Sequence, residues 1–143
     1  MTVDLEFLPP TLRRGEPATE EQLSLLEQAV GAPLPQQYRA FLRQTNGAAG
    51  AVGDGYVHLY SSDDVADAKR TVDLPEMPGF LLVGSNGGGM AIGLSASEGE
   101  VFVVPWDSLD PEYVRPRAPS FSEFLRRLCD TPHESLFGLS ATP

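Results

Sequence analysis

Few residues of this sequence are of the types that perform nucleophilic catalysis. The histidines are His58 and His133, and the only cysteine is Cys129. Ser95 lies in Gly-Leu-Ser-Ala-Ser, which lacks the second glycine of a nucleophile elbow. A serine or cysteine nucleophile needs a base beside it. We expect a structural or surface position for His58, a passive one for His133 and a packing role for Cys129. The sequence therefore predicts no catalytic residue and no enzyme.

Three aspartates gather in a short stretch, and carboxylates can bind metal ions. On a helix Asp63 and Asp67 share one face, whereas Asp64 is rotated by about 100° from Asp63. The spacing also lacks the Asp-x-Asp-x-Asp-Gly pattern of a calcium loop. We expect a solvated acidic face or, alternatively, a docking patch for a basic partner, and no metal site. The same two interpretations apply to a second acidic group beside Trp106, formed by Asp107, Asp110 and Glu112.

The glycine-rich run Gly84–Gly89 has the composition of a phosphate-binding loop. A P-loop needs a lysine at its end and a helix after it, and a dinucleotide-binding turn needs that helix too. Here no lysine is present and a strand pattern follows. We therefore expect a β-hairpin with several residues at positive φ, and no cofactor.

Aromatic side chains are the remaining candidates for binding chemistry. Tyr56, His58 and Tyr60 alternate along a predicted strand and so share one face. They either pack as a half-buried sheet face or anchor a partner, because Tyr and Trp are enriched at binding hot spots. Trp106 allows the same two interpretations. The candidate partner-binding residues are Tyr56, Tyr60, Asp63, Asp64, Asp67, Trp106, Asp107, Asp110 and Glu112.

Composition limits the classes of partner. The chain has 143 residues, a length that suits one domain, and a formal net charge of −10. Such a charge disfavours nucleic acids and anionic membranes and attracts a basic partner, although acidity can also serve solubility alone. No apolar run is long enough for a membrane span, and Met1–Leu8 lacks the basic residue of a signal peptide. We expect a cytoplasmic protein without disulfides.

Local signals predict four helices. Capping boxes begin at Thr19, Ser61 and Ser120. Gly31 ends the first helix, and a second runs from Pro35 to Asn46-Gly47, so the first two should form a tight pair. In the last helix the apolar residues have i, i+3, i+4, i+7 spacing and should face the core; they are Phe121, Phe124, Leu125 and Leu128.

The strand pattern predicts an antiparallel sheet. Apolar or alternating runs occupy 56–60, 80–83, 90–94 and 101–106, and the turns that join the last three runs are too short for parallel crossovers. We expect a flexible glycine turn region around Gly50–Gly55, a loop over Asp107–Pro119 and a loosely held tail over Thr131–Pro143. The fold class is α+β, with a single domain over 1–143 and a core of about 19–128.

The order of these segments resembles a known family. The segments, in chain order, read LPQQYRAFLRQTNGA, VHLYSSDDVADAK, FLLVGSNGGGMAIGL, VFVVPWDS and SFSEFLRRL. Together they resemble the SMI1/KNR4 (SUKH) superfamily over roughly Thr19–Leu128. The resemblance implies a helix pair before a mostly antiparallel sheet and a C-terminal helix on the core. It also implies binding of another protein: an immunity protein that neutralises a cognate toxin, here a basic toxin domain, or alternatively a regulatory scaffold for an endogenous protein.

Overall fold

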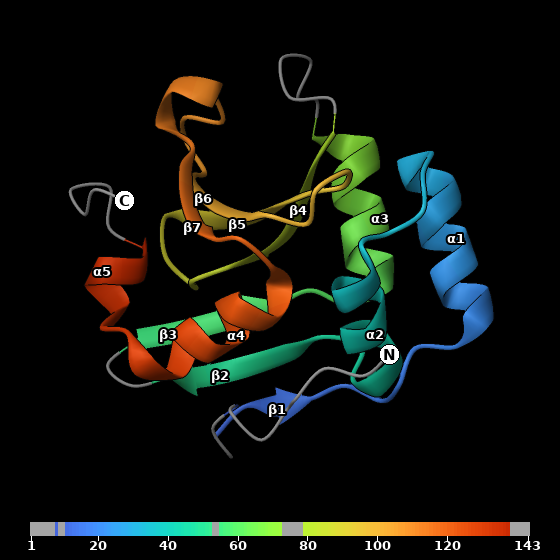
Figure 1. The fold of residues 1–143 in the computed structure, drawn as a ribbon, viewed down its shortest axis with the longest axis horizontal. Coiled ribbons are helices and arrows are strands. Elements are labelled where there is room, and N and C mark those ends of the chain that lie inside the picture. Colours follow the sequence, from blue (N-terminus) through green and yellow to red (C-terminus); the bar gives the residue numbers. More distant parts are fainter. Residues whose placement is uncertain (1–7, 9–10, 53–54, 73–78, 138–143) are drawn as a thin grey trace.

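The protein folds as an α+β structure in which one sheet bends around a helical layer. The computed structural model describes residue 8 and residues 11–52, 55–72 and 79–137. Within these ranges, seven strands form one sheet in the order β1 to β7, and every neighbouring pair is antiparallel. This confirms the fold class and the strand direction expected from the short links (Figure 1).

The strands follow chain order across the sheet. Their bounds are β1 Arg13–Arg14, β2 Ala48–Val52, β3 Gly55–Leu59, β4 Phe80–Ser85, β5 Met90–Ser95, β6 Val101–Pro105 and β7 Arg115–Ala118. The helices are α1 Glu20–Val30, α2 Gln36–Gln44, α3 Ser62–Thr71, α4 Phe121–Asp130 and α5 His133–Phe137, with a 3-10 turn η1 at Pro111–Tyr113.

The predicted helix boundaries rest on hydrogen bonds between residues close in sequence. Thr19 and Gln22 form a complete capping box before α1, and Gly31 ends that helix at φ 83°. Ser61 and Ser120 each accept a hydrogen bond from the amide three residues later, at the starts of α3 and α4. The Glu123 carboxylate lies 3.3 Å from Arg127 Nε, one turn along α4.

The core lies between the inner side of the sheet and the helices α2 and α4. The predicted apolar stripe of α4 is buried along its whole length, and Phe124 is 0% exposed. The Phe121 ring packs 5.0 Å from Tyr38 and 5.0 Å from Phe41 on α2. Figure 1 shows α4 between β2–β3 on one side and the later strands on the other.

Ion pairs connect the two N-terminal helices. Arg39 on α2 contacts Glu20 at 2.9 Å and Glu27 at 3.6 Å, both on α1. The nearest helical neighbour of α1 is α3, whereas α2 lies against α4. The two helices follow one another as expected, but they do not form the predicted tight pair, because α1 packs chiefly on α3 and α2 on α4.

Four segments differ from the prediction. Gly50 of the expected glycine turn region lies in β2 and Gly55 begins β3, whereas residues 53–54 lie outside the described ranges. Gly50 allows the close approach of Thr11, since a Cβ there would lie 2.5 Å from the Thr11 carbonyl oxygen. The expected loop Asp107–Pro119 contains η1 and the edge strand β7. An edge strand tolerates Pro116, which has no amide to donate.

The C-terminal segment is the third difference. Residues 133–137 form α5, and its Leu136 and Phe137 are each 3% exposed, so this part of the expected loose tail belongs to the core. His133 packs 4.7 Å from Phe137, and its ring covers Gly55. Residues 138–143 lie outside the described ranges. The hairpin turn also differs: among the described glycines of the 84–89 run, Gly87 alone has positive φ, at 75°.

Candidate protein-binding face

The register of the sheet places residues from six strands on one side. Successive cross-strand partners are Arg13, Ala49, His58, Ser85, Ala91 and Val104. Directly paired residues point to the same side of a sheet, and so do residues two apart along a strand. We call this side the outer face, because the buried neighbours Val57 and Leu59 point to the core side.

Two aromatic residues flank the glycine turn on the outer face. Tyr56 lies two residues before His58, and Trp106 two residues after Val104, so both extend toward the β4–β5 turn. A Cβ at Gly87 would lie 2.6 Å from Tyr56 Cδ1, and the Trp106 amide donates to the Gly89 carbonyl at 2.8 Å. The two aromatics stand three strand spacings apart, about 14 Å along the sheet.

The tyrosines of β3 have different degrees of exposure. Tyr56 is 42% exposed. Tyr60 is half-buried, and its ring lies edge-on to His58 at 4.9 Å. Burial raises the pKa of Tyr60; a hydrogen bond to Ser85 opposes this shift, and the nearby Asp64 carboxylate adds to it. Tyr60 therefore remains a neutral phenol, which can donate to a partner's acceptor.

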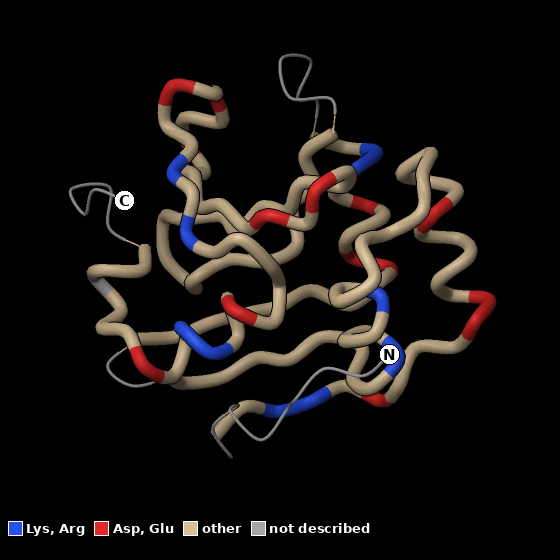
Figure 2. The backbone as a smooth tube through the Cα atoms, in the orientation of Figure 1, with Lys and Arg blue, Asp and Glu red and all other residues tan. Residues whose placement is uncertain are grey.

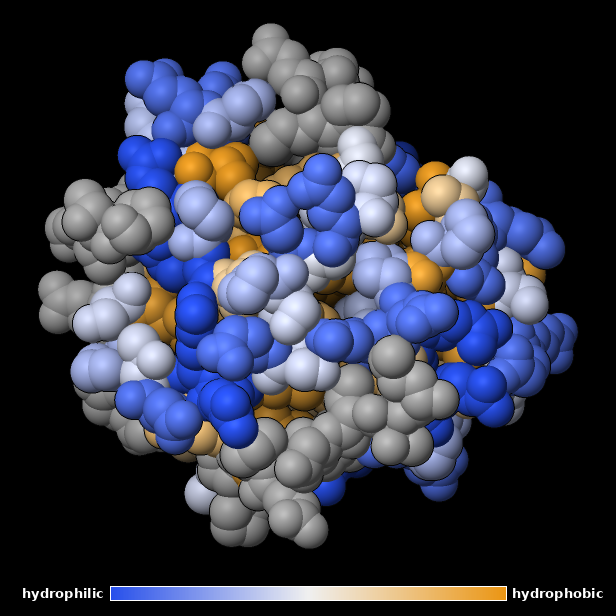
Figure 3. Space-filling model, viewed as in Figure 1, coloured by the Kyte–Doolittle hydropathy of each residue, from blue (hydrophilic) through white to orange (hydrophobic). Residues whose placement is uncertain are grey.

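Trp106 belongs to a second apolar cluster on the outer side of the sheet. Its buried members are Phe80, Leu82, Ala91 and Val104. The partly buried members include Phe102, Leu109 and Val114, and the second half of α3 covers one end through Ala68 and Val72. Figure 3 shows hydrophobic surface beside the hydrophilic tip at the upper left, where β6, η1 and β7 lie. Trp106 is thus both a packing residue and a surface residue.

The acidic candidates divide between two ends of the outer face. On α3, Asp63 and Asp64 are exposed in the first turn, near Tyr60, whereas Asp67 pairs with Arg70 at 2.8 Å. The other group follows Trp106 and forms the acidic tip seen in Figure 2. There Asp110 caps η1 through the Glu112 amide at 2.9 Å, and Asp107 and Glu112 are exposed.

Sequence reasoning overlooked several features of this face. A shallow hollow of about 290 Å³ next to His58 is lined by Arg13, Ser61 and Asp64 among others. The turn between Tyr56 and Trp106 exposes Gly87 and Gly89, which have no side chains. Alternation along β3 could identify Tyr56 and Tyr60 as one set, but the strand register was needed to add Trp106, Arg13 and the glycine turn.

The residues examined for catalysis occupy separate places. Cys129 is exposed on α4, so its predicted packing role is wrong. The Cys129 Sγ lies 3.8 Å from the Leu125 carbonyl oxygen. His133 lies 3.3 Å from the Asn86 side chain and supports α5. In the described ranges, no three His, Cys, Asp or Glu side chains gather as metal ligands, and no helix has the length and apolarity to cross a membrane.

The fold and the outer face define a class: a small α+β domain in which one side of an antiparallel sheet is partly uncovered. The chain belongs to the SMI1 / KNR4 family (SUKH-1), whose family model matches residues 17–127. No curated protein matches the chain. Membership of this family is consistent with an immunity-type, protein-binding domain.

Proposed function

We propose that this protein is an immunity protein that binds and neutralises a cognate toxin, and that the outer face holds the toxin. The observation that carries the proposal is the pair Tyr56 and Trp106 beside the bare glycine turn. Anchoring aromatic side chains with an uncovered backbone between them suit a protein partner.

The charge of the chain indicates the chemistry of that partner. The net charge is −10, and exposed carboxylates stand near both Tyr60 and Trp106. Carboxylates around an aromatic centre steer a basic surface and raise the association rate. The proposed partner is therefore a basic toxin domain, met in the cytoplasm, and the protein acts by occupying the toxin surface without catalysing a reaction.

The test is co-expression with the toxin domain encoded beside this protein's gene. The wild-type chain should restore growth and form a stable complex, and Tyr56→Ala should weaken both effects. Leu25→Ala is the matched control, since Leu25 on α1 is also an exposed large side chain, at 52%. Unchanged protection by Tyr56→Ala and Trp106→Ala would reject the outer face as the toxin-binding surface.

The same experiment separates the alternative, a regulatory scaffold. A scaffold would bind an endogenous protein and leave the growth arrest by the toxin unchanged. Protection without a complex, or turnover of the toxin or of a small substrate by the purified chain, would point instead to an enzyme.

A further inference from the structure

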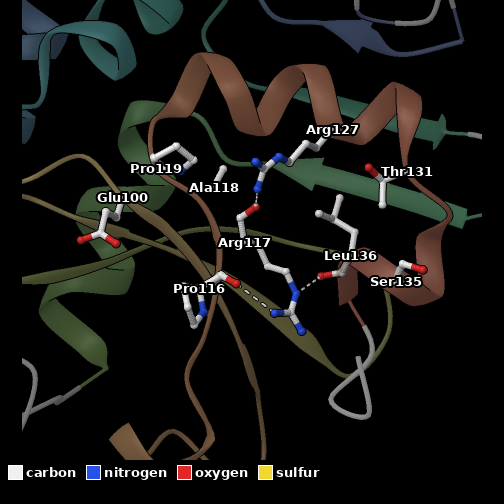
Figure 4. Close-up of a pocket in the computed structure, with 9 residues that line it drawn as sticks. All are labelled: Glu100, Pro116, Arg117, Ala118, Pro119, Arg127, Thr131, Ser135 and Leu136. Atoms are coloured by element: carbon white, nitrogen blue, oxygen red, sulfur yellow. Dashed lines mark hydrogen bonds between the residues drawn. The ribbon is translucent and has the colours of Figure 1, made fainter. Parts of the chain in front are cut away.

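A cavity of about 460 Å³ lies on a different part of the molecule, between β7, α4 and α5. Arg117 and Arg127 supply its cationic groups, and Thr131 and Ser135 supply hydroxyls. Its apolar wall includes Pro119 and Leu136. Figure 4 shows these side chains around the opening, with the two arginines contributed by β7 and α4.

Arg117 is held in a fixed orientation. The residue is only 7% exposed, and its Nε and Nη1 donate to the carbonyls of Leu136 and Pro116 at 2.7 and 2.9 Å. Burial lowers the pKa of Arg117, but an arginine keeps its charge in proteins. These bonds tie the cavity wall to α5, so the guanidinium is already ordered before any ligand arrives.

Arg127 brings a second guanidinium to the same wall. Its Nη1 donates to the Arg117 carbonyl, and its Nε lies 3.3 Å from the Glu123 carboxylate. The Arg127 side chain is 42% exposed, so it can reach a ligand in the cavity.

The sign of the local charge is opposite to that of the whole molecule. Four of the ten Lys and Arg residues lie within thirteen positions, 115–127, in a chain of net charge −10. Figure 2 shows the basic residues of β7 and α4 on this side of the protein. Glu100 also lines the cavity and offsets one of its two arginines.

We propose that this cavity binds a carboxylate presented by a peptide, with the attached apolar chain resting on the exposed Pro116 and Pro119. Arginine forks match carboxylates in geometry. A single negative charge suits a site whose two arginines are already partly balanced, by Glu100 in the wall and by Glu123 beside Arg127, whereas a dianionic phosphate is opposed by both glutamates and by the acidic molecule. The cavity volume is in the range of small-ligand sites. This site is independent of the outer face.

The test is an NMR titration of the full chain with matched peptides. The probes are N-acetyl-Leu-Leu with a free carboxyl terminus, N-acetyl-Leu-Glu amide, N-acetyl-Leu-Leu amide and inorganic phosphate. At least one carboxylate peptide should bind about 10-fold or more tightly than the neutral amide, as expected for hydrogen bonds to charged groups. Its shifts should centre on Thr131 and Ser135. The two carboxylate peptides distinguish a chain terminus from an acidic side chain.

Neighbouring arginines on α4 supply a matched pair of variants. Arg127→Gln should reduce carboxylate binding about 10-fold, whereas Arg126→Gln, which removes the same charge outside the cavity lining, should leave it nearly unchanged. Arg117→Lys, which keeps the charge but loses the fork, is a third variant. Equal losses in both glutamine variants, equal binding of the amide, tighter binding of phosphate, or no shift with any peptide would overturn the proposal.

Discussion

The aromatic residues form two groups on opposite sides of one sheet. The inner group comprises Tyr38, Phe41, Phe121 and Phe124, each at most 1% exposed. In the outer group Tyr56 is 42% exposed and Trp106 is partly buried, whereas the half-buried Tyr60, just after β3, also packs against the inner cluster. Aromatic side chains are therefore fully buried in the inner group, whereas in the outer group Tyr56 is available for contact and Trp106 both packs and reaches the surface.

Residues of strand β3 point alternately to the core and to the outer face. Val57 and Leu59 are buried in the core, whereas Tyr56 and His58 lie on the outer face. A shift of one residue in register would exchange the two sets. The inner and outer groups should therefore respond differently to mutation.

The largest effect on stability is expected in the inner group. Phe124→Ala removes a ring that is 0% exposed and leaves a cavity between α4 and the sheet. The free energy of unfolding should fall by about 3–5 kcal/mol, measured by chemical denaturation. A loss below about 1 kcal/mol would mean that this face of α4 is not part of the core.

The outer group should affect binding instead. Tyr56→Ala should cost about 2 kcal/mol of binding free energy, mostly as faster dissociation, with little change in unfolding. Trp106→Ala should speed dissociation as well, but should also lower stability because Trp106 packs on the second cluster. Kinetics with the captured toxin and denaturation of the free protein would measure both effects. If Tyr56→Ala lowered the free energy of unfolding but left binding unchanged, the outer group would serve stability and not contact with a partner.

A substitution at Tyr38, also in the inner group, is expected to raise stability. Among the described residues, its buried hydroxyl has no hydrogen-bond partner. Tyr38→Phe should therefore keep the ring contacts and raise stability by about 1 kcal/mol, as seen in denaturation. A loss of more than about 1 kcal/mol would show that the hydroxyl is paired.

Tyr38 also predicts a dependence on alkaline pH. Burial raises the pKa of Tyr38 in the folded state, so the unfolded chain loses its proton first, near pH 10. The contribution of this group to stability is thus complete below about pH 10 and decreases above it. Tyr38→Phe should show a shallower decline there. Tyr60 shares the direction of the shift and remains in both proteins as an internal control.

The smallest effect on stability is expected for the outer carboxylates. Replacing Asp63, Asp64 and Asp67 by Asn should change unfolding by less than about 1 kcal/mol. The same variant should slow association with a basic partner and weaken its salt dependence, because exposed charges act over about a Debye length. Salt-independent association with no loss in the variant would exclude α3 as the steering element, and Asp107, Asp110 and Glu112 would be tested next.

The helices were predictable from sequence because their signals are local. The capping box at Thr19, the left-handed Gly31 and the apolar stripe from Phe121 to Leu128 join residues a few positions apart. The antiparallel pairing of β4, β5 and β6 was also predictable, since the short links between these strands allow no parallel crossover.

Segments with weak local signals were not predictable. Strand β2 depends on Gly50 accepting the close approach of Thr11, a residue far away in the chain. Strand β7 contains Pro116 and exists because it pairs with β6 at the sheet edge. Helix α5 is short, and its burial of Leu136 and Phe137 depends on the surface that α4 and the sheet provide.

The candidate sites also combine features that are readable from sequence with features that only the tertiary structure reveals. The sequence by itself determined the net charge of −10, the acidic groups and the alternation of Tyr56, His58 and Tyr60. Only the tertiary structure decided that Trp106, fifty positions after Tyr56, shares its face, and that Arg117 and Arg127 line one cavity. The physical reason is that strand register and helix docking are set by long-range packing, which periodicity along the chain does not encode.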